Sequence, residues 1–593
     1  MGVQKDCHTP FTERLHSINI SLKLGGGLIL LKGEKNYEVQ VRQDNRWGTE
    51  SVRDSEVLAR QLAKELLKNK KCAGARVVEN CPLRDGSMDE TVIFERTQDV
   101  NNKKPIRIIP LDEAPQHCRT AKDIFSLESR IILNRVLRIY FEDVSLTPTE
   151  VLHSHRELQR LSDKDSLLPS VISHIAKLQT TGTTISARER QDEIYVLLGQ
   201  IMARAERATS QKLPEITGLF SQTLATVTRT GEETSEYLAM VALSRDLIGI
   251  DSWVGKLDRL CKLAIGENDA RSVLLLDTVI ADVLGANVIQ EVLGWQRSLG
   301  SAIISMVDLA EGSFEVEISD AKETVTLLNK LLAAKALPGS RHVILERAMR
   351  QLKSSNPLYQ ADPEMELGEY QRVLARLLEP GQIISGAYAA EALTVRGNQF
   401  IEQGGKAGRR ASIGATVDAL PDPARGVMYL AELSNTEFAK DHIDDIVKQL
   451  DGVFAARVIG ELTRQSMSPK ERMVAATGAY NVATSSALPE PVKQRIAVHI
   501  DDVLERYLID ADIINKLDTP EHHIRDRAVR LVKFCGAGVL PEGKALSLAR
   551  KHVIKMLRQP KFDVSFIEGI NDVARSEKAL RNFHKLLIKA GIA

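Results

Sequence analysis

The sequence predicts a mainly α-helical protein in which a small α+β N-terminal domain precedes a long helical array. Apolar residues follow a strand period within the first 118 residues and a helical period almost without interruption from residue 119. Aromatic residues make up only 4% of the 593-residue chain. The core must therefore be built from aliphatic side chains, which suits packed helices better than a β-sandwich.

Residues 1–118 are expected to form the α+β domain. Apolar and polar residues alternate in 16–24 and again in 37–42. A glycine triplet follows the first of these segments, and the apolar run at 28–33 predicts the return strand of a hairpin. Residues 51–71 have helical spacing instead. Further short strands are predicted at 75–79, 91–96 and 105–110.

Helix start signals are frequent after residue 119. A Ser or Thr at the N-cap and a Glu three residues later satisfy two free backbone N–H groups reciprocally, and Pro is well tolerated at the first helical position. Residues with this pattern are Thr147, Ser186, Ser434 and Ser468, while Thr519 heads a variant with His in place of Glu. The segment 121–143 is apolar around much of its circumference, which predicts a single buried central helix.

The helical array is interpreted as an α-solenoid of HEAT-like helix pairs, with a large multi-helix bundle as the alternative. Three similar segments each place an acidic residue at the start of an apolar face, and these residues are Asp277, Asp444 and Asp501. Their irregular spacing gives no clean repeat period. A polar, Pro-containing stretch at 354–369 is the candidate linker, which leaves helical region I at 119–353 and helical region II at 370–593.

Composition and motifs argue against several classes of function. Acidic and basic residues both number 79, so the zero net charge disfavours nucleic acid as the main partner. No apolar run is long enough to span a bilayer, and no phosphate-binding loop, nucleophile elbow or zinc-protease motif occurs. We expect no catalytic residue, no metal and no cofactor, although an enzyme without linear motifs stays open. His153 and His155 are expected on the surface.

The segment GGKAGRRASIGATVD, residues 404–418, is the candidate functional site. Its basic residues Lys406, Arg409 and Arg410 lie among four glycines, which predicts an exposed loop between helices. Three hypotheses follow: a solvated turn, a contact for an anion or a protein partner, and a phosphorylation site. The last arises because Arg-Arg-Ala-Ser matches what basophilic kinases select, with Ser412 as the acceptor.

These features favour a cytoplasmic, non-enzymatic helical scaffold or adaptor that mediates protein–protein interactions, with signalling as its context. The cytoplasmic location is inferred from a polar N-terminus without an apolar signal segment and from scattered, unpaired cysteines. The alternative is a signalling protein that binds a nucleotide or another small phosphorylated ligand. Its binding site would be the N-terminal domain or the basic Gly-rich segment 404–414.

Overall fold

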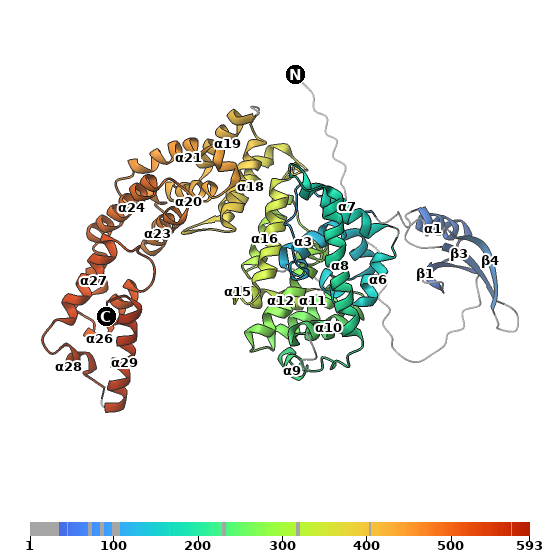
Figure 1. Ribbon diagram of the computed structural model, residues 1–593, viewed down its shortest axis with the longest axis horizontal. Coiled ribbons are helices and arrows are strands. Elements are labelled where there is room, and N and C mark those ends of the chain that lie inside the picture. The colour runs from blue at the N-terminus through green and yellow to red at the C-terminus, as the bar shows by residue number, and fades with distance from the viewer. Residues whose placement is uncertain are drawn as a thin grey trace, which may run out of the picture. The chain divides into compact units, whose positions relative to one another are not determined.

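The chain divides between residues 105 and 106 into two compact units (Figure 1). A computed structural model describes residues 35–43, 46–68, 74–82, 88–97, 107–164, 166–227, 233–315, 321–401, 405–570 and 572–592. The predicted hairpin at 16–33 lies outside the described residues. The predicted fold class is confirmed, because a small antiparallel sheet with one helix is followed by a helical array.

The first unit is a four-stranded antiparallel sheet with a helix on one face, coloured blue in Figure 1. The strand order is β2-β1-β3-β4. The elements are β1 (Asn36–Gln43), β2 (Arg46–Arg53), α1 (Glu56–Lys68), β3 (Gly74–Pro82) and β4 (Met88–Thr97). Alternate residues of β1 point to one face and are buried with α1, as the strand period requires. The buried set includes Tyr37, Val39 and Val41 from β1 and Ala59, Ala63 and Leu67 from α1.

Two sequence predictions for the first 118 residues are wrong. Residues 51–53, expected to begin a helix, instead complete β2. Residues 107–110, the described part of the strand expected at 105–110, belong to no strand. The N–H of Ile109 donates to the carbonyl of Val136 in α3 (Leu127–Val136) at 2.9 Å, and Leu111 is buried in the core of the neighbouring helices. These residues therefore pack with the helices, and the division by contacts falls between residues 105 and 106. The domain boundary at 118 stays a prediction.

The second unit begins with a group of helices of very different lengths. They are α2 (Ala121–Ile124), α3, α4 (Arg138–Val144), α5 (Pro148–Leu152), α6 (His155–Ser162), α7 (Leu167–Thr180), α8 (Ala187–Thr209) and α9 (Phe220–Thr226). The middle of the unit adds longer helices and one short β-ribbon. These elements are α10 (Ser235–Ile248), α11 (Trp253–Ile265), α12 (Ala270–Gly285), α13 (Val288–Leu293), α14 (Leu299–Ala310), α15 (Lys322–Ala333), α16 (Pro338–Lys353), η1 (Pro363–Met365), α17 (Glu366–Leu377), β5 (Leu378–Glu379), β6 (Gln382–Ile383) and α18 (Gly386–Asn398).

The rest of the unit is again helical. Its elements are α19 (Gly405–Ala419), α20 (Pro423–Ser434), η2 (Glu437–Asp441), α21 (Ile443–Leu450), η3 (Asp451–Ala455), α22 (Ile459–Leu462), α23 (Pro469–Ser485), α24 (Glu490–Asp510), α25 (Ile513–Leu517), α26 (Ile524–Cys535), α27 (Lys544–Leu557), α28 (Phe562–Ile567) and α29 (Val573–Lys589). Helices near one another in sequence pack together, as α18, α20, α23, α24 and α27 do in succession. The choice between solenoid and bundle stays a prediction.

The core of the second unit has one long cluster and two smaller ones near its start. The long cluster runs from Ile216 to Ala590, one smaller cluster lies mainly among α3 to α8, and the other joins Ala208 to Val227 and α10. Leu358, inside the candidate linker 354–369, is fully buried in the long cluster, and residues on both sides of that stretch belong to one unit. The division into two helical regions at 354–369 stays a prediction.

The helix caps follow the sequence signals in part. The capping boxes at Thr147, Ser186 and Ser468 are confirmed, with each hydroxyl accepting from the N–H three residues later. Those expected at Ser434 and Thr519 are wrong. Ser434 is the last residue of α20, and α26 begins only at residue 524, capped by the histidine before it. The Ser434 motif starts no helix because α20 still includes that residue.

The single helix expected at 121–143 is three short helices, α2, α3 and α4. The first break occurs where the Ser126 side chain accepts from the N–H of Ser129 and so caps α3. The preceding ring of Phe125 lies 5.2 Å from the ring of His153 and 6.2 Å from that of Tyr237, edge to face. His153 is therefore buried in an aromatic cluster, and its expected surface position is wrong.

Two of the three aligned aspartates perform the same structural role. Asp277 of α12 accepts from the N–H groups of Gly339 and Ser340, in the first turn of α16, at 2.6 and 2.9 Å. Asp501 of α24 likewise accepts from the first N–H groups of α27 at 2.6 and 3.1 Å. Each buried carboxylate satisfies free donors and complements the positive helix end. Asp444 is exposed instead.

Candidate functional site

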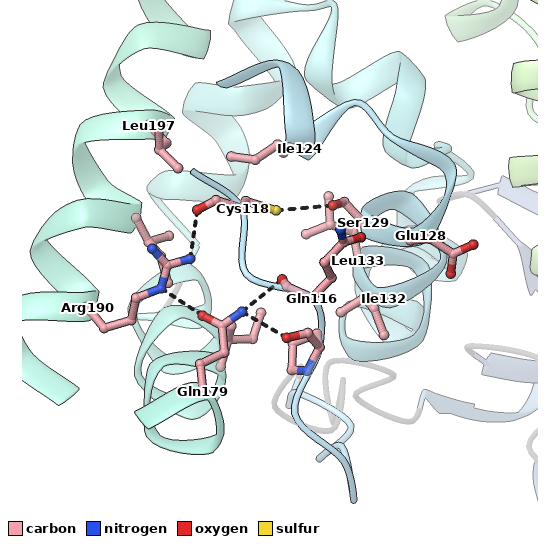
Figure 2. A pocket seen from close by; sticks show the side chains of 13 residues that line it. Gln116, Cys118, Ile124, Glu128, Ser129, Ile132, Leu133, Gln179, Arg190 and Leu197 are labelled. Carbon is pink, nitrogen blue, oxygen red and sulfur yellow. Dashed lines mark hydrogen bonds between the residues drawn. The ribbon is translucent and has the colours of Figure 1, made fainter. Parts of the chain in front are cut away.

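A pocket of about 340 Å³ lies among α2, α3, α7 and α8, and residues 115–118 close one side of it (Figure 2). Small-molecule sites in proteins are clefts of roughly 300–1,000 Å³, lined mainly by apolar side chains with a few polar groups. The pocket has this size and this character. All of its lining residues lie between 115 and 197, so it belongs entirely to the second unit.

Aliphatic side chains form most of the wall. They come from all four helices and are Ile124, Ile132, Leu133, Ile175, Ile194 and Leu197. A smaller cavity of about 90 Å³ shares four of these residues and continues toward the apolar core of α4 and α5. An apolar body in the pocket would therefore meet hydrocarbon on several sides, and burying it would be favourable by about 25 cal/mol per Å².

The polar end of the pocket is built around Arg190, whose side chain is only 2% exposed. Its Nε donates to Gln179 Oε1 at 2.8 Å, and its Nη2 donates to the carbonyl of Cys118 at 2.9 Å (Figure 2). Its Nη1 donates to Glu193 Oε2 at 2.6 Å. The Gln179 amide in turn donates to the carbonyls of Pro115 and Gln116. Two side chains thus fasten the 115–118 segment over the pocket.

Glu193 is the anionic partner of Arg190 and reaches solvent. Its side chain is 53% exposed, whereas the guanidinium it binds is buried. The hydrogen bond from Arg190 lowers the pKa of Glu193, and this pKa is lowered further by His117, whose Nε2 lies 3.7 Å from the same carboxylate oxygen. Glu193 therefore contacts one fixed cation and one exposed imidazole.

The opposite wall carries a thiol and a hydroxyl. Cys118 Sγ lies 3.2 Å from Ser129 Oγ, and this hydroxyl donates to the carbonyl of Asp123 at 2.8 Å. Glu128, at the rim, lies 3.4 Å from His342. These groups give the pocket hydrogen-bonding positions in addition to Arg190.

The local sequence explains how α8 positions Arg190. Ser186 caps the helix, and the N–H of Arg190 donates to the carbonyl of Ser186 at 3.1 Å, which fixes the first turn. Arg190, Ile194, Leu197 and Ile201 recur at intervals of three and four residues and so share one face. The sequence reasoning missed this pocket. The available signal was an arginine on the apolar stripe of an otherwise ordinary amphipathic helix.

Other buried charges nearby are fully partnered within the protein. Lys256 Nζ lies 2.5 Å from Glu150 Oε1, and both side chains are 0% exposed. Arg130 Nε donates to Asp282 Oδ1 at 3.0 Å, and the other carboxylate oxygen of Asp282 accepts from Thr149. These pairs hold α3 and α5 to α11 and α12. These ion pairs stabilise the packing of the helices, and neither pair lines a cavity as large as the pocket.

The sequence-predicted site lies elsewhere, on α19, and the exposed loop expected for it is wrong. Residues from Gly405 onward form a helix. Ser412 is fully buried and donates to the carbonyl of Thr394 in α18 at 2.7 Å. A β-carbon at Gly397 of α18 would lie only 2.9 Å from Ser412 Oγ. The small residues therefore let two helices approach closely instead of making a turn.

The basic residues of this segment are only partly described. The backbone of Lys406 lies in α19, but its side chain is outside the described part of the chain. Arg409 is exposed and stacks over the ring of Phe438, with 5.6 Å to the centroid. Arg410 is 57% exposed, and its Nε lies 3.1 Å from Asp445. The structure places Arg409 and Arg410 on the exposed side of α19 and Ser412 on the packed side.

Within the described residues, no group of three or more His, Cys, Asp and Glu side chains is arranged to hold a metal ion. No described helix combines the length and the apolar character needed to cross a membrane. No protein family model matches the chain, and comparison with curated proteins and with solved structures finds no similar protein.

Proposed function

We propose that this protein binds a small, mainly apolar molecule in the pocket among α2, α3, α7 and α8. The observation that carries the proposal is an aliphatic cavity of about 340 Å³ with a buried arginine at its edge. Cores normally fill such space with side chains. A cavity that combines apolar walls with a convergent set of polar groups is the usual form of a ligand site.

The test measures saturable binding of N-phenyl-1-naphthylamine, a neutral apolar fluorophore, to the full chain. Ile175→Trp should fill the space, because Ile175 lines both cavities. We expect this variant to bind the probe at least about tenfold more weakly, which corresponds to about 1.4 kcal/mol. Leu274→Trp is the matched control, since Leu274 is 51% exposed on α12. Equal affinity of wild type and Ile175→Trp would overturn the proposal.

The helical array is further proposed to act as a scaffold for protein partners, with the exposed side of α19 as one contact. Arg409 and Arg410 supply that contact with positive charge. Substituting Lys406, Arg409 and Arg410 by Ala should weaken capture of the native partner, and added salt should mimic this loss. Arg575→Ala/Lys578→Ala/Arg581→Ala is the matched control, because these three basic residues are exposed on α29. Unchanged capture by the α19 variant would end this proposal.

The alternative of a nucleotide or phosphorylated ligand stays a proposal for the same basic segment and for the first unit. Thermal-shift measurements with nucleotides test it directly, because a ligand that binds only the folded state raises the melting temperature. A rise that disappears in the α19 triple variant would support the basic segment. A rise kept by that variant but lost on removal of residues 1–105 would support the first unit. No rise with any nucleotide would exclude both.

A further inference from the structure

We infer that the ligand of the pocket is a monocarboxylic acid with an aliphatic body, and that its carboxylate takes the place of Glu193 on Arg190. This inference rests on the proposed function of the pocket. It adds the chemical class of the ligand and the residue that the ligand displaces.

The charge balance at Arg190 is the reason for inferring a carboxylic acid. Of its three acceptors, Gln179 Oε1 and the Cys118 carbonyl are neutral, and only Glu193 carries a negative charge. A buried guanidinium needs an anion, because desolvating a charge without a partner is costly. Any molecule that displaces Glu193 must therefore bring a negative charge of its own.

Glu193 is the partner that can leave. It is 53% exposed, and its carboxylate also lies 3.7 Å from the exposed imidazole of His117. A rotation of its side chain toward solvent keeps that second contact within reach and breaks no core packing. Gln179 and the Cys118 carbonyl, in contrast, hold the 115–118 segment in place. The exchange therefore gives up one ion pair with a half-exposed carboxylate and replaces it with another carboxylate on the same guanidinium.

The number of charges favours a carboxylate over a phosphate. One guanidinium faces the pocket, and because Gln179 and the Cys118 carbonyl keep their bonds, its Nη1 is the donor that a ligand carboxylate would take over from Glu193. The other charged group of the lining is Glu128 at the rim, which is 58% exposed and lies near His342. A dianionic phosphate would find a single cation and a nearby carboxylate, and so would remain half neutralised.

The walls specify the rest of the molecule. Beyond Arg190, the pocket is lined mainly by isoleucine and leucine, and the adjoining cavity of about 90 Å³ has wholly aliphatic and aromatic surroundings. No described aromatic ring lines the larger pocket to stack on a planar ligand. A flexible aliphatic chain fits such irregular space by adjusting its torsions, and each methylene group that it buries strengthens binding.

The experiment compares decanoate, decanol and decylamine as competitors of N-phenyl-1-naphthylamine on the full-length protein. We expect decanoate to bind about tenfold more tightly than decanol, because a hydrogen bond to a charged group contributes more than a neutral one. Decylamine should bind most weakly. Glu193→Gln should raise decanoate affinity about two- to fivefold, since it removes the competing carboxylate. Asp192→Asn, an exposed neighbour on the same helix, is the matched control and should change nothing.

The outcomes separate this inference from the proposed function. If the three competitors bind equally, and Ile175→Trp weakens all of them, the pocket binds apolar molecules but the carboxylate inference is wrong. If the Glu193→Gln and Asp192→Asn variants bind decanoate equally, the displacement of Glu193 is wrong. If neither probe nor competitors bind, both proposals fail. Arg190→Gln should abolish the preference for decanoate, and Glu193→Gln keeps the test valid if that variant does not fold.

Discussion

Replacing Lys256 by methionine should destabilise the second unit by about 3–5 kcal/mol, because it leaves a buried carboxylate without its cation. Lys256 Nζ lies 2.5 Å from Glu150 Oε1 and 2.7 Å from the carbonyl of Ser145, and neither side chain of the ion pair is exposed. Burial lowers the pKa of Lys256 and raises that of Glu150, so each charge depends on the other. Methionine keeps most of the apolar stem of the side chain and removes the ammonium group, with its ion pair to Glu150 and its hydrogen bond to the Ser145 carbonyl.

The assay is urea unfolding followed by circular dichroism, in a double-mutant cycle with Glu150→Gln. The double variant should recover a large part of the loss, because no uncompensated charge then remains. Lys440→Met is the matched control, since Lys440 and Glu437 form an ion pair that is 71% and 86% exposed. The control should lose less than about 0.5 kcal/mol. If Lys256→Met and Lys440→Met shift the unfolding midpoint equally, the reasoning from burial is refuted.

Four further outcomes test the structure. Ser412→Glu should destabilise the protein by about 3 kcal/mol or more, because it buries a charge beside α18. Ala411→Glu, on the exposed side of α19, is the control and should change the free energy of unfolding little. Equal urea midpoints for the two variants would contradict the packing of α19. Burial lowers the pKa of His153 to about 4, below its unfolded value near 6.5. The contribution of the neutral imidazole to the free energy of unfolding should therefore be complete above pH 6.5, and about 3 kcal/mol of it should be lost as the pH drops toward 4. His153→Gln should flatten this part of the pH–stability curve, and an unchanged slope would count against the burial of the imidazole. Trp295, 87% exposed, should account for most of the acrylamide-quenchable tryptophan emission, so Trp295→Ala should remove it with little change in melting temperature. Deleting residues 1–105 should leave a soluble helical protein with an unchanged urea midpoint, and an insoluble product would show that the two units share a core.

The sequence was sufficient to predict the fold class, because the spacing of apolar residues and the helix-capping motifs are local properties. The alternation of 37–42 and the boxes at Thr147, Ser186 and Ser468 depend on neighbours within a few residues. Predictions failed where a distant contact decided the outcome. The ring of Phe125 packs against those of His153 and Tyr237, and no local period reveals these contacts.

The segment 404–418 shows how glycine misleads a local interpretation. Glycine favours turns because it tolerates left-handed backbone, and Gly405 does have a φ of +69°. Ser412 instead serves close packing of α19 on α18, as the short distance from a β-carbon at Gly397 to Ser412 Oγ shows. Both uses of a small residue give the same composition. Only the position of α18 beside α19 distinguishes them.

A buried arginine by itself does not mark a binding site, and two other buried arginines, Arg347 and Arg396, show why Arg190 differs. Arg396 donates to the carbonyls of Leu352 and Asn356, and Arg347 donates to the carbonyl of Ala286. In these cases the guanidinium ties a helix end to its neighbour through backbone carbonyls. Arg396 also donates to Gln399 Oε1 and lies 3.7 Å from Glu366, a carboxylate that is only 17% exposed. Arg190 also holds one carbonyl, but its charge is balanced by a half-exposed side chain at the edge of an aliphatic cavity. It combines a fixed cation, an exchangeable anion and an apolar space, and a carboxylic acid is the ligand that satisfies all three.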